Sequence, residues 1–433
     1  MPSVKLSQWV EQSQLRGVIG DTGKRMRRVC AWMLVVLMVG AGAPAAWADS
    51  LDVIGAYDPG TAGLNASAVG LDGIAYLGSW GSPGDCPGLG VRIVDVRDPA
   101  APDPLGTAAA YTGTTAEHLA AVHFATPAFT GNVLFAGIQR CSGNGGAPGG
   151  LAIWDVTDPA NPSELGFLST GRGPRGVHEF TVRQRGDRWL AYLAVWNSEL
   201  TDGTGDLRIV DVTDPRQPFE LVDWGAKRDA GLPVGAGAQC QPFCRGAVPQ
   251  ASLHSVALSP DGGTAYLSYW DLGVIMLDVS EPEMPRWLGR YAEPQAAEGN
   301  THSVALAHDG KLALVADETF GPPWGRLRLV DVQQPANPVQ VGSFDTPDSE
   351  AGTPGEQYAY TIHNPLTDDR DTNRAYLAWY ADGIRVLDIS DASQPVELTS
   401  WIPPRGGMIW NVAFMGDLLL AGDINNGLFV LRR

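Results

Sequence analysis

A short apolar pattern recurs along the chain and constrains its fold more than any other feature. It occurs at residues 91–96 (VRIVDV), 151–156 (LAIWDV), 207–212 (LRIVDV), 274–279 (VIMLDV), 327–332 (LRLVDV), 384–389 (IRVLDI) and 428–431 (LFVL). The aspartates of the first six runs are 53 to 67 residues apart, and five of these runs lead into a turn that contains proline, which is Asp-Pro in three of them, such as Asp98-Pro99. A period of this size indicates an array of equivalent units rather than one irregular core. We expect each repeated aspartate to accept hydrogen bonds from the turn that follows it.

Each unit contains four short segments that are typical of strands. In the fourth unit an alternating run, 254–258, is followed by a turn at 260–263 and a second apolar run at 265–268. The repeated run comes third, and a short piece comparable to 338–342 comes fourth. No part of residues 49–433 shows sustained helical periodicity. Four strands per unit predict an all-β, seven-bladed β-propeller of four-stranded blades over residues 49–433.

The two ends of this region predict how the ring closes. Residues 51–57 (LDVIGAY) look like a fourth strand, comparable to 339–344, whereas the chain stops after a third strand at 428–431. We therefore expect the N-terminal strand to pair with the C-terminal blade. This pairing would remove two exposed sheet edges.

Two families resemble this sequence. The run at 207–215, LRIVDVTDP, resembles the signature of LVIVD-repeat proteins of bacterial and archaeal surfaces, and the resemblance extends over about residues 51–433. It implies a propeller and implies no particular activity. A weaker resemblance, to the selenium-binding/methanethiol oxidase propellers, rests on residues 254–261 and 266–268. That second resemblance implies copper held by histidines and oxidation of a small thiol, although the cysteine motif of that group is not seen here.

Residues 1–48 have the pattern of a secretory signal peptide. A basic cluster at 24–28 precedes an apolar run at 29–42, and Ala46-Trp47-Ala48 forms the cleavage site. A start at Met26 would give a signal of ordinary length. After cleavage we expect no membrane span and a secreted, periplasmic or cell-surface location.

The four cysteines that follow the signal predict two disulfides, as in other exported proteins. Cys86 and Cys141 lie in long Gly/Pro loops between second and third strands, at 79–90 and 140–150, and a bridge between them is plausible. Cys240 and Cys244 lie in an insertion, 239–249, and close a small local ring. All four map to one face of the predicted propeller, where loops on a rigid scaffold carry function.

The charge of the chain excludes some partners. The net charge is −18; residues 1–48 hold six Lys/Arg and two Asp/Glu, which leaves 24 basic against 46 acidic residues, or −22. Such a surface repels nucleic acid and anionic lipid. It serves solubility, or it attracts cations and basic partners.

Histidines at the start of first strands in four consecutive units are candidate metal ligands: His118, His178, His254 and His302. First strands line the channel of a propeller, so these side chains would converge at its mouth. Imidazoles bind transition metals, and copper, iron and zinc are the candidate ions. Glu117 and Glu179 adjoin two of the histidines as further ligands or as their partners. The alternative is structural, with each histidine hydrogen-bonded to the backbone of the next blade.

The remaining units are expected to place other residues at the position of these histidines. Asn65, Tyr360 and Trp410 take roughly corresponding places, and His123, His308 and His363 are expected to lie elsewhere. Aromatic residues end several second strands and are expected to rim the same mouth: Trp80, Trp196, Trp270 and Tyr380. An aromatic rim stacks sugars or holds cationic groups, and the alternative is packing between blades.

No common catalytic motif accompanies these features. The sequence has no P-loop, no dinucleotide fingerprint after a strand, no G-x-S-x-G and no HExxH. The favoured function is therefore a non-enzymatic binding or scaffolding module at the cell exterior, with its ligand face at the channel mouth. Its partner would be an extracellular or periplasmic protein, a glycan or a small ligand. The alternative is a metal-dependent, copper-like oxidoreductase with a histidine site at the channel, and a purely structural surface protein is the third hypothesis.

Overall fold

The repeated apolar runs form strands because their side chains are buried on both faces of a sheet. In the fourth unit every residue of Gly273–Leu277 is buried, and only Asp278, at the end of the strand, is partly exposed. The computed structural model describes residues 51–81, 86–141, 145–246, 248–294, 299–404 and 406–433. The chain divides into two units, Met1–Trp47 and Ala48–Arg433. The predicted signal peptide lies outside the described residues.

Four of the sheets have four antiparallel strands in chain order. The first two are formed by β10 (Val177–Arg185), β11 (Arg188–Val195), β12 (Leu207–Asp211) and β13 (Phe219–Trp224), and by β16 (Leu253–Leu258), β17 (Thr264–Tyr269), β18 (Gly273–Asp278) and β19 (Arg286–Tyr291). The next two are formed by β20 (Thr301–Ala307), β21 (Leu312–Asp317), β22 (Leu327–Asp331) and β23 (Val339–Phe344), and by β24 (Pro365–Thr367), β25 (Arg374–Trp379), β26 (Gly383–Asp388) and β27 (Val396–Trp401). The repeated run is the third strand of each.

The first two units share one eight-stranded sheet. Its strands are β2 (Asn65–Leu71), β3 (Ile74–Ser79), β4 (Val91–Asp95), β5 (Asp103–Ala108), β6 (Thr114–Ala125), β7 (Thr130–Arg140), β8 (Gly150–Asp155) and β9 (Ser163–Ser169). A single residue pair, Ser79 with Ala116, links β3 to β6. The two halves of this sheet are therefore joined at one point only.

The N-terminal strand completes the last sheet. β1 (Asp52–Tyr57) pairs antiparallel with β30 (Gly427–Arg432), which pairs with β29 (Leu418–Asp423) and then with β28 (Ile409–Met415). Residues 51–57 thus supply the fourth strand of a sheet whose other three strands come from the end of the chain.

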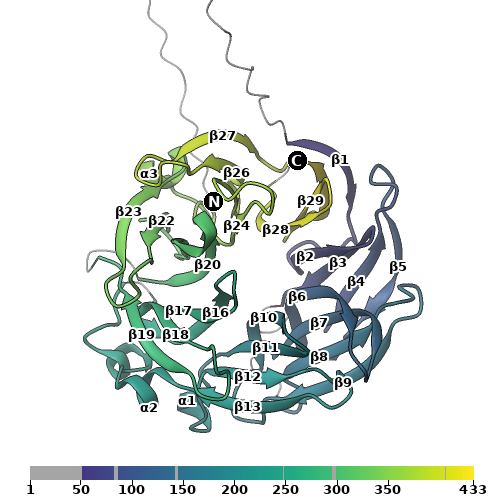
Figure 1. The fold of residues 1–433 in the computed structure, drawn as a ribbon. Coiled ribbons are helices and arrows are strands. Elements are labelled where there is room, and N and C mark those ends of the chain that lie inside the picture. Colours follow the sequence, from purple (N-terminus) through teal and green to yellow (C-terminus); the bar gives the residue numbers. More distant parts are fainter. Residues whose placement is uncertain (1–50, 82–85, 142–144, 247, 295–298, 405) are drawn as a thin grey trace, which may run out of the picture. The chain divides into compact units, whose positions relative to one another are not determined.

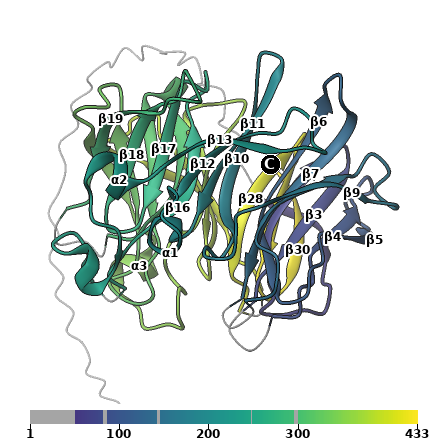
Figure 2. The same ribbon diagram turned by 90° about the horizontal axis from the view of Figure 1, so that it is seen from below.

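Residues 51–433 form an all-β β-propeller, with the sheets following one another around a common centre (Figure 1). The first strand of each unit contacts the first strand of the next, in the order β2, β6, β10, β16, β20, β24, β28 and back to β2. Seen from below, the strands run from one face of the ring to the other (Figure 2). The apolar core lies between adjacent sheets, as in the cluster that contains Ile209 of one sheet and Leu267 of the next.

The turn after the third strand fastens several units to the preceding sheet. The carboxylate of each repeated aspartate accepts a hydrogen bond from the backbone N–H two residues later, as predicted; in the fifth unit the Gln333 nitrogen lies 2.9 Å from Asp331 Oδ1. In three units the carbonyl of the turn proline, Pro99, Pro215 or Pro335, then meets a glycine in the fourth strand of the preceding sheet. A Cβ on Gly289 would lie 1.8 Å from the Pro335 oxygen, so no side chain fits there.

Short helices and turns join the sheets. They are α1 (Ser198–Thr201), α2 (Ala226–Ala230), α3 (Pro347–Ala351) and the 3-10 turns η1 (Gly237–Cys240) and η2 (His308–Gly310), and a small ribbon pairs β14 (Gly235–Ala236) with β15 (Gln250–Ala251). None of the helices in the described ranges is long and apolar enough to span a membrane. Both predicted disulfides are present, Cys86–Cys141 and Cys240–Cys244.

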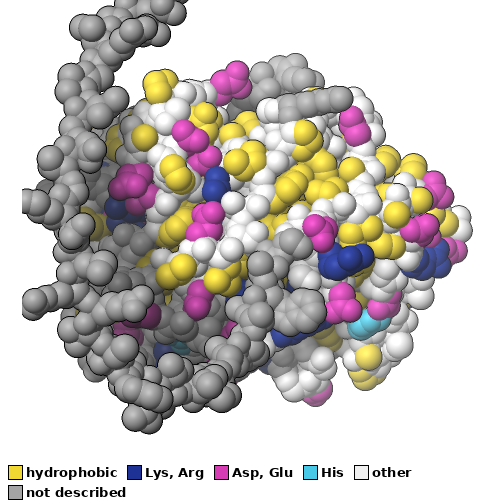
Figure 3. All heavy atoms as spheres, turned by 90° about the horizontal axis from the view of Figure 1, so that it is seen from above, with side chains coloured by type: hydrophobic (Ala, Val, Ile, Leu, Met, Phe, Trp, Pro, Cys, Tyr) yellow, Lys and Arg dark blue, Asp and Glu magenta, His cyan; other side chains and the backbone are white. Residues whose placement is uncertain are grey.

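The outer strands carry exposed apolar residues among acidic ones. In β27, Val396 and Leu398 are exposed, and Ile402 follows the strand. Apolar side chains spread over the side of the molecule near this strand, with Asp and Glu between them (Figure 3).

Candidate functional site

A β-bulge interrupts the first strand of nearly every unit at the same place. In β16 the register with β17 shifts between Leu253 and Ser255, so that His254 has no partner in the ladder. Equivalent shifts occur in β2, β6, β10, β20 and β28. A bulge re-aims the side chain of the extra residue, here toward the centre of the ring. We call the residue at this place the bulge position of its unit.

The bulge positions hold histidine in four consecutive units and other residues in the rest. In chain order they are Ala66, Glu117, His178, His254, His302, His363 and Trp410. The residue at the end of the second strand, which we call the strand-end position, also varies between units. In chain order the strand-end positions hold Trp80, Gln139, Trp196, Trp270, Glu318, Tyr380 and Ile424.

These two sets of side chains enclose one cavity of about 390 Å³. Every strand-end residue lines it, and so does every bulge residue except Ala66. Loop residues complete the wall: Arg175, Val248, Gln250, Phe320, Gln357, Tyr358 and Met408. The pocket is therefore built by equivalent positions of all the repeats, and small-ligand sites in proteins have this size and concave shape.

The polar half of the pocket is a row of four histidines from consecutive first strands or the segment just before one. The ring centroids of His178 and His254 are 4.0 Å apart, those of His254 and His302 3.9 Å, and those of His302 and His363 4.1 Å. His178 Nε2 and His254 Nε2 lie 2.6 Å apart. The indole of Trp270 stacks on His254 with an angle of 5° between the planes.

Glu117 extends this row at one end. The Gln139 amide donates hydrogen bonds to Glu117 Oε1 at 2.8 Å and to His178 Nδ1 at 2.7 Å. The Thr115 hydroxyl also donates to Glu117 Oε1, at 2.7 Å. Because Nδ1 of His178 is an acceptor, its proton sits on Nε2 and points to His254. Glu117 Oε2 is buried and has no hydrogen-bond partner among the described residues.

Glu318 lies at the other end of the row, between two histidines. Its Oε2 is 3.9 Å from His302 Nε2, and its Oε1 is 3.8 Å from His363 Nε2. The Tyr380 hydroxyl donates to Glu318 Oε1 at 2.6 Å. His363 Nδ1 donates to the carbonyl of Trp410 at 2.6 Å, which leaves Nε2 of His363 as an acceptor.

Burial sets the charge state of these groups. Desolvation lowers the pKa of His178 to about 3 and that of His363 to about 3, and it lowers the pKa values of His254 and His302 well below the ordinary range. It raises the pKa of Glu117 and of Glu318 to about 7 and that of Glu179 to about 8. The imidazoles are thus neutral, with lone pairs available to a cation.

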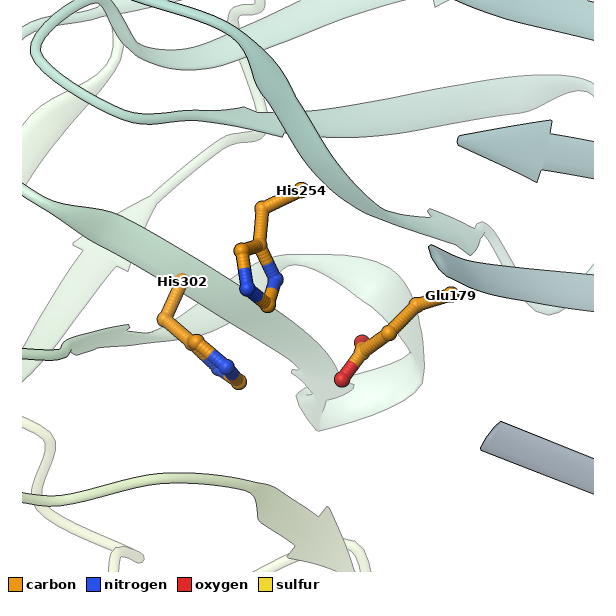
Figure 4. Close-up of side chains that lie close together, drawn as sticks. All are labelled: Glu179, His254 and His302. Carbon is orange, nitrogen blue, oxygen red and sulfur yellow. The ribbon is translucent and has the colours of Figure 1, made fainter. Parts of the chain in front are cut away.

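Among the described residues, two groups of three side chains are close enough to hold a metal ion. One contains His302, Glu318 and His363, and the other contains Glu179, His254 and His302. In each group the candidate ligand atoms all lie within 4.8 Å of one another. In the second group the two imidazoles and the carboxylate point toward a common centre (Figure 4). Glu179 is buried but does not line the cavity.

The other half of the pocket is apolar and aromatic. The ring centroids of Trp80 and Trp410 lie 5.4 Å apart, and Met408 and Ile424 extend this apolar surface. Tyr358 and Tyr380 belong to the adjoining wall and stack at 5.6 Å. Their φ angles are +68° and +31°, a region that residues with side chains rarely adopt and that clusters at functional sites.

The structure places the sequence-predicted residues in two groups. His178, His254, His302, Glu117 and the four aromatics Trp80, Trp196, Trp270 and Tyr380 all line the cavity. His118 does not line it. The bulge of β6 makes Glu117, not His118, the equivalent of His178. His118 Nδ1 instead accepts a hydrogen bond from the Phe180 backbone of the next unit, which is the structural alternative for the histidines.

His363 is the histidine that sequence reasoning placed outside the row. The sequence predicts Tyr360 at the place of the other histidines, but the backbone N–H of His363 donates to the Ala378 carbonyl of the second strand and the His363 ring reaches the pocket. Pro365 follows closely, and β24 is only three residues long, so the alternation that marks a first strand is missing there. Likewise Asn65 is one residue before the bulge position, at Ala66. Gln139 and Glu318 were detectable as residues at the ends of second strands.

Comparisons with known proteins agree with the repeat architecture. The family model described as the LVIVD repeat matches residues 298–346 and 373–401. No curated protein matches the chain.

Several solved structures share the fold at low sequence identity. A periplasmic gluconolactonase of Pseudomonas aeruginosa has a TM-score of 0.57 and 14% identity, over 83% of this chain and 92% of that one. A putative 6-phosphogluconolactonase of Bacteroides uniformis has a TM-score of 0.52 and 14% identity, over 82% and 90%. Raptor of Chaetomium thermophilum has a TM-score of 0.56 and 13% identity, over 88% and 29%. At these identities the likeness concerns the fold alone.

Proposed function

Because this chain is an LVIVD-repeat β-propeller, we propose that it is an exported binding module that holds a small ligand in the pocket at its channel mouth. One observation carries the proposal: the strand-end positions of all the repeats and all of the bulge positions except Ala66 converge on one cavity. A pocket with an aromatic wall and an opposite wall of histidines and carboxylates suits a small molecule that has an apolar ring and polar groups. Its volume suits such a molecule better than a protein loop or a long glycan.

The proposal includes seven blades and a closed ring. The eight-stranded sheet counts as two blades, since one residue pair joins its halves, and the pairing of β1 with β30 completes the last blade. Two disulfides and the N-terminal signal pattern favour an oxidising location outside the cytoplasm.

The test blocks the pocket without touching its polar half. Ile424→Trp places at the seventh strand-end position the residue type that three other units carry there, and it narrows the apolar wall. A set of small fluorinated aromatic fragments is screened against the full chain by 19F NMR. We expect fragments that bind with a Kd of roughly 1 mM or tighter and that lose binding to the Ile424→Trp protein.

The matched control is Val396→Trp, which adds the same side chain on the exposed outer strand β27 and should leave fragment binding unchanged. Fragments that bind both variants as they bind the unaltered protein would refute a ligand site in this pocket, as would a complete absence of binding.

A second candidate function is a metal-dependent oxidoreductase, and the row of buried neutral histidines favours it. The resemblance to the selenium-binding group stays a prediction. This function requires a bound redox metal, so metal analysis of the pocket decides first.

A further inference from the structure

We infer that His302, Glu318 and His363 bind one divalent first-row transition metal ion at the polar wall of the pocket. The inference deepens the proposed function, because the ion would face the same cavity as the ligand. The three side chains come from two neighbouring units, and all three line the cavity.

The distances between the three side chains fit a shared ion better than direct contacts. The two His–Glu separations, 3.9 Å and 3.8 Å, are too long for hydrogen bonds. Two ligand atoms that each lie about 2.1 Å from an ion are at most about 4.2 Å apart. The two His–Glu separations, one to each carboxylate oxygen, are within that limit, and the three candidate ligand atoms all lie within 4.8 Å of one another, so small side-chain rotations would bring them around one ion.

His302 supplies the strongest independent sign of a missing partner. Its side chain is 1% exposed, and neither Nδ1 nor Nε2 has a hydrogen-bond partner among the described residues. A buried polar group without a partner costs about 1–3 kcal/mol. A buried polar group without a partner therefore calls for an explanation, and a bound ion at the imidazole nitrogen is one.

The neighbours of the other two ligands hold them ready for a cation. The Trp410 carbonyl accepts a hydrogen bond from the Nδ1–H group of His363. This leaves Nε2 of His363 unprotonated, with its lone pair on the side of Glu318. The Tyr380 hydroxyl, at 2.6 Å, orients the Glu318 carboxylate. A hydrogen bond to the second nitrogen of a ligating histidine and one to a ligating carboxylate are common around metal ions.

The ligand types select the class of ion. Two imidazoles and one carboxylate suit iron(II) and zinc, with positions left open for a water or a ligand. Calcium and magnesium prefer sites made of oxygen atoms. The open positions would face the cavity, since all three residues are on its wall.

The second group, Glu179, His254 and His302, shares His302 with this site (Figure 4). Glu179 does not line the cavity, so an ion held there would be less accessible to a pocket ligand. Replacing Glu318 or Glu179 one at a time shows which of the two groups holds the ion.

The experiment measures metal uptake by the full chain. After chelator treatment the protein is titrated with zinc by calorimetry, and with iron(II) without oxygen, and the bound ion is counted by elemental mass spectrometry. We expect about one ion per chain, and at least about 100-fold weaker binding in His302→Ala, His363→Ala and the isosteric Glu318→Gln. Tyr380→Phe should weaken binding by roughly 10- to 100-fold, since it removes only an orienting hydrogen bond.

The controls distinguish this site from its alternatives. His123→Ala removes an exposed histidine that pairs with Asp72, and it should bind the ion unchanged. Failure of the unaltered chain to bind either ion overturns the inference, as does full binding by Glu318→Gln with loss in Glu179→Gln. If no metal binds while the fragments still require an open pocket, the ligand proposal stands without the metal.

Discussion

The Asp-Pro turns and the pocket are built from the same repeats, yet they use repetition in opposite ways. At the turns the units keep one residue type, because each aspartate performs the same task of accepting a backbone N–H at 2.8–2.9 Å. At the bulge and strand-end positions the residue type varies between units, although four consecutive bulge positions hold histidine, and nearly all of these side chains meet at one cavity. In this repeat protein, therefore, an aspartate kept in each turn marks a structural task, and a position whose side chains converge in space marks the candidate site.

The carboxylates of the two regions also differ in charge. Hydrogen bonds from the side chain and backbone of Ser280 lower the pKa of Asp278. Burial raises the pKa of Glu117 to about 7. The carboxylate of Asp278 is thus stabilised as an anion at neutral pH, whereas burial favours the protonated form of Glu117 and Glu318. The following predictions test this division.

The largest effect is expected where a turn meets the neighbouring sheet. In Gly289→Ala the new Cβ would fall 1.8 Å from the Pro335 oxygen, so the turn or the strand must move. We expect the free energy of unfolding to fall by about 3 kcal/mol, measured by guanidinium denaturation. Gly106→Ala is the matched control, because Gly106 also lies in a fourth strand but its Cβ would meet nothing within 4 Å. Equal losses in the two variants would contradict the interlock.

A smaller effect is expected from one turn aspartate. Asp278→Ala removes the acceptor for the Ser280 N–H and hydroxyl, which should cost about 1 kcal/mol at pH 7. The lowered pKa means that the charge stabilises the fold above the unfolded pKa of about 3.9, and that this part is lost as the pH falls through the folded pKa. The difference between the two proteins should therefore shrink in acid. Asp278→Asn should keep most of the neutral-pH stability, and a pH-independent loss in the Ala variant would refute the assignment.

The smallest effect is expected in the pocket, and it has the opposite sign. A raised carboxyl pKa means that the folded protein keeps a proton that the unfolded chain loses near pH 4.3, so stability declines as the pH rises from about 4.3 and levels off above about 7. In Glu117→Gln this decline is removed. We expect the variant to gain stability relative to the unaltered protein between pH 5 and pH 8, by less than about 1 kcal/mol because relaxation of the surroundings reduces the cost of the buried charge. Denaturation at the two pH values, with chelator present, measures the gain; a constant difference would contradict a buried acid.

Much of the fold could be predicted, because strands and turns leave local patterns in each repeat. The third strands, the N-terminal fourth strand and both disulfides lie where the repeats indicated. The LVIVD resemblance is confirmed as well. The direction of each side chain was inferred from the two-residue alternation of a strand. That alternation predicts the direction correctly only while the strand pairing is regular.

The site was predicted less completely, because a bulge adds one residue to a strand and so shifts which side chains face the cavity. The shift in β6 exchanges His118 for Glu117, and the short β24 hides His363. Glu318 follows its strand as Trp270 does, but a carboxylate there does not resemble an aromatic rim in sequence. Spatial convergence of unlike residues carries no local signal, so the arrangement around His302 required the structure.

The bulge that interrupts most of the first strands has a consequence for how such a protein changes over time. The extra residue takes no part in the ladder, so replacing its side chain leaves the sheet intact and alters only what faces the cavity. Most repeats therefore contribute one replaceable side chain to the pocket. Evolution, or directed libraries at these positions, can change the specificity of the pocket while the scaffold stays the same.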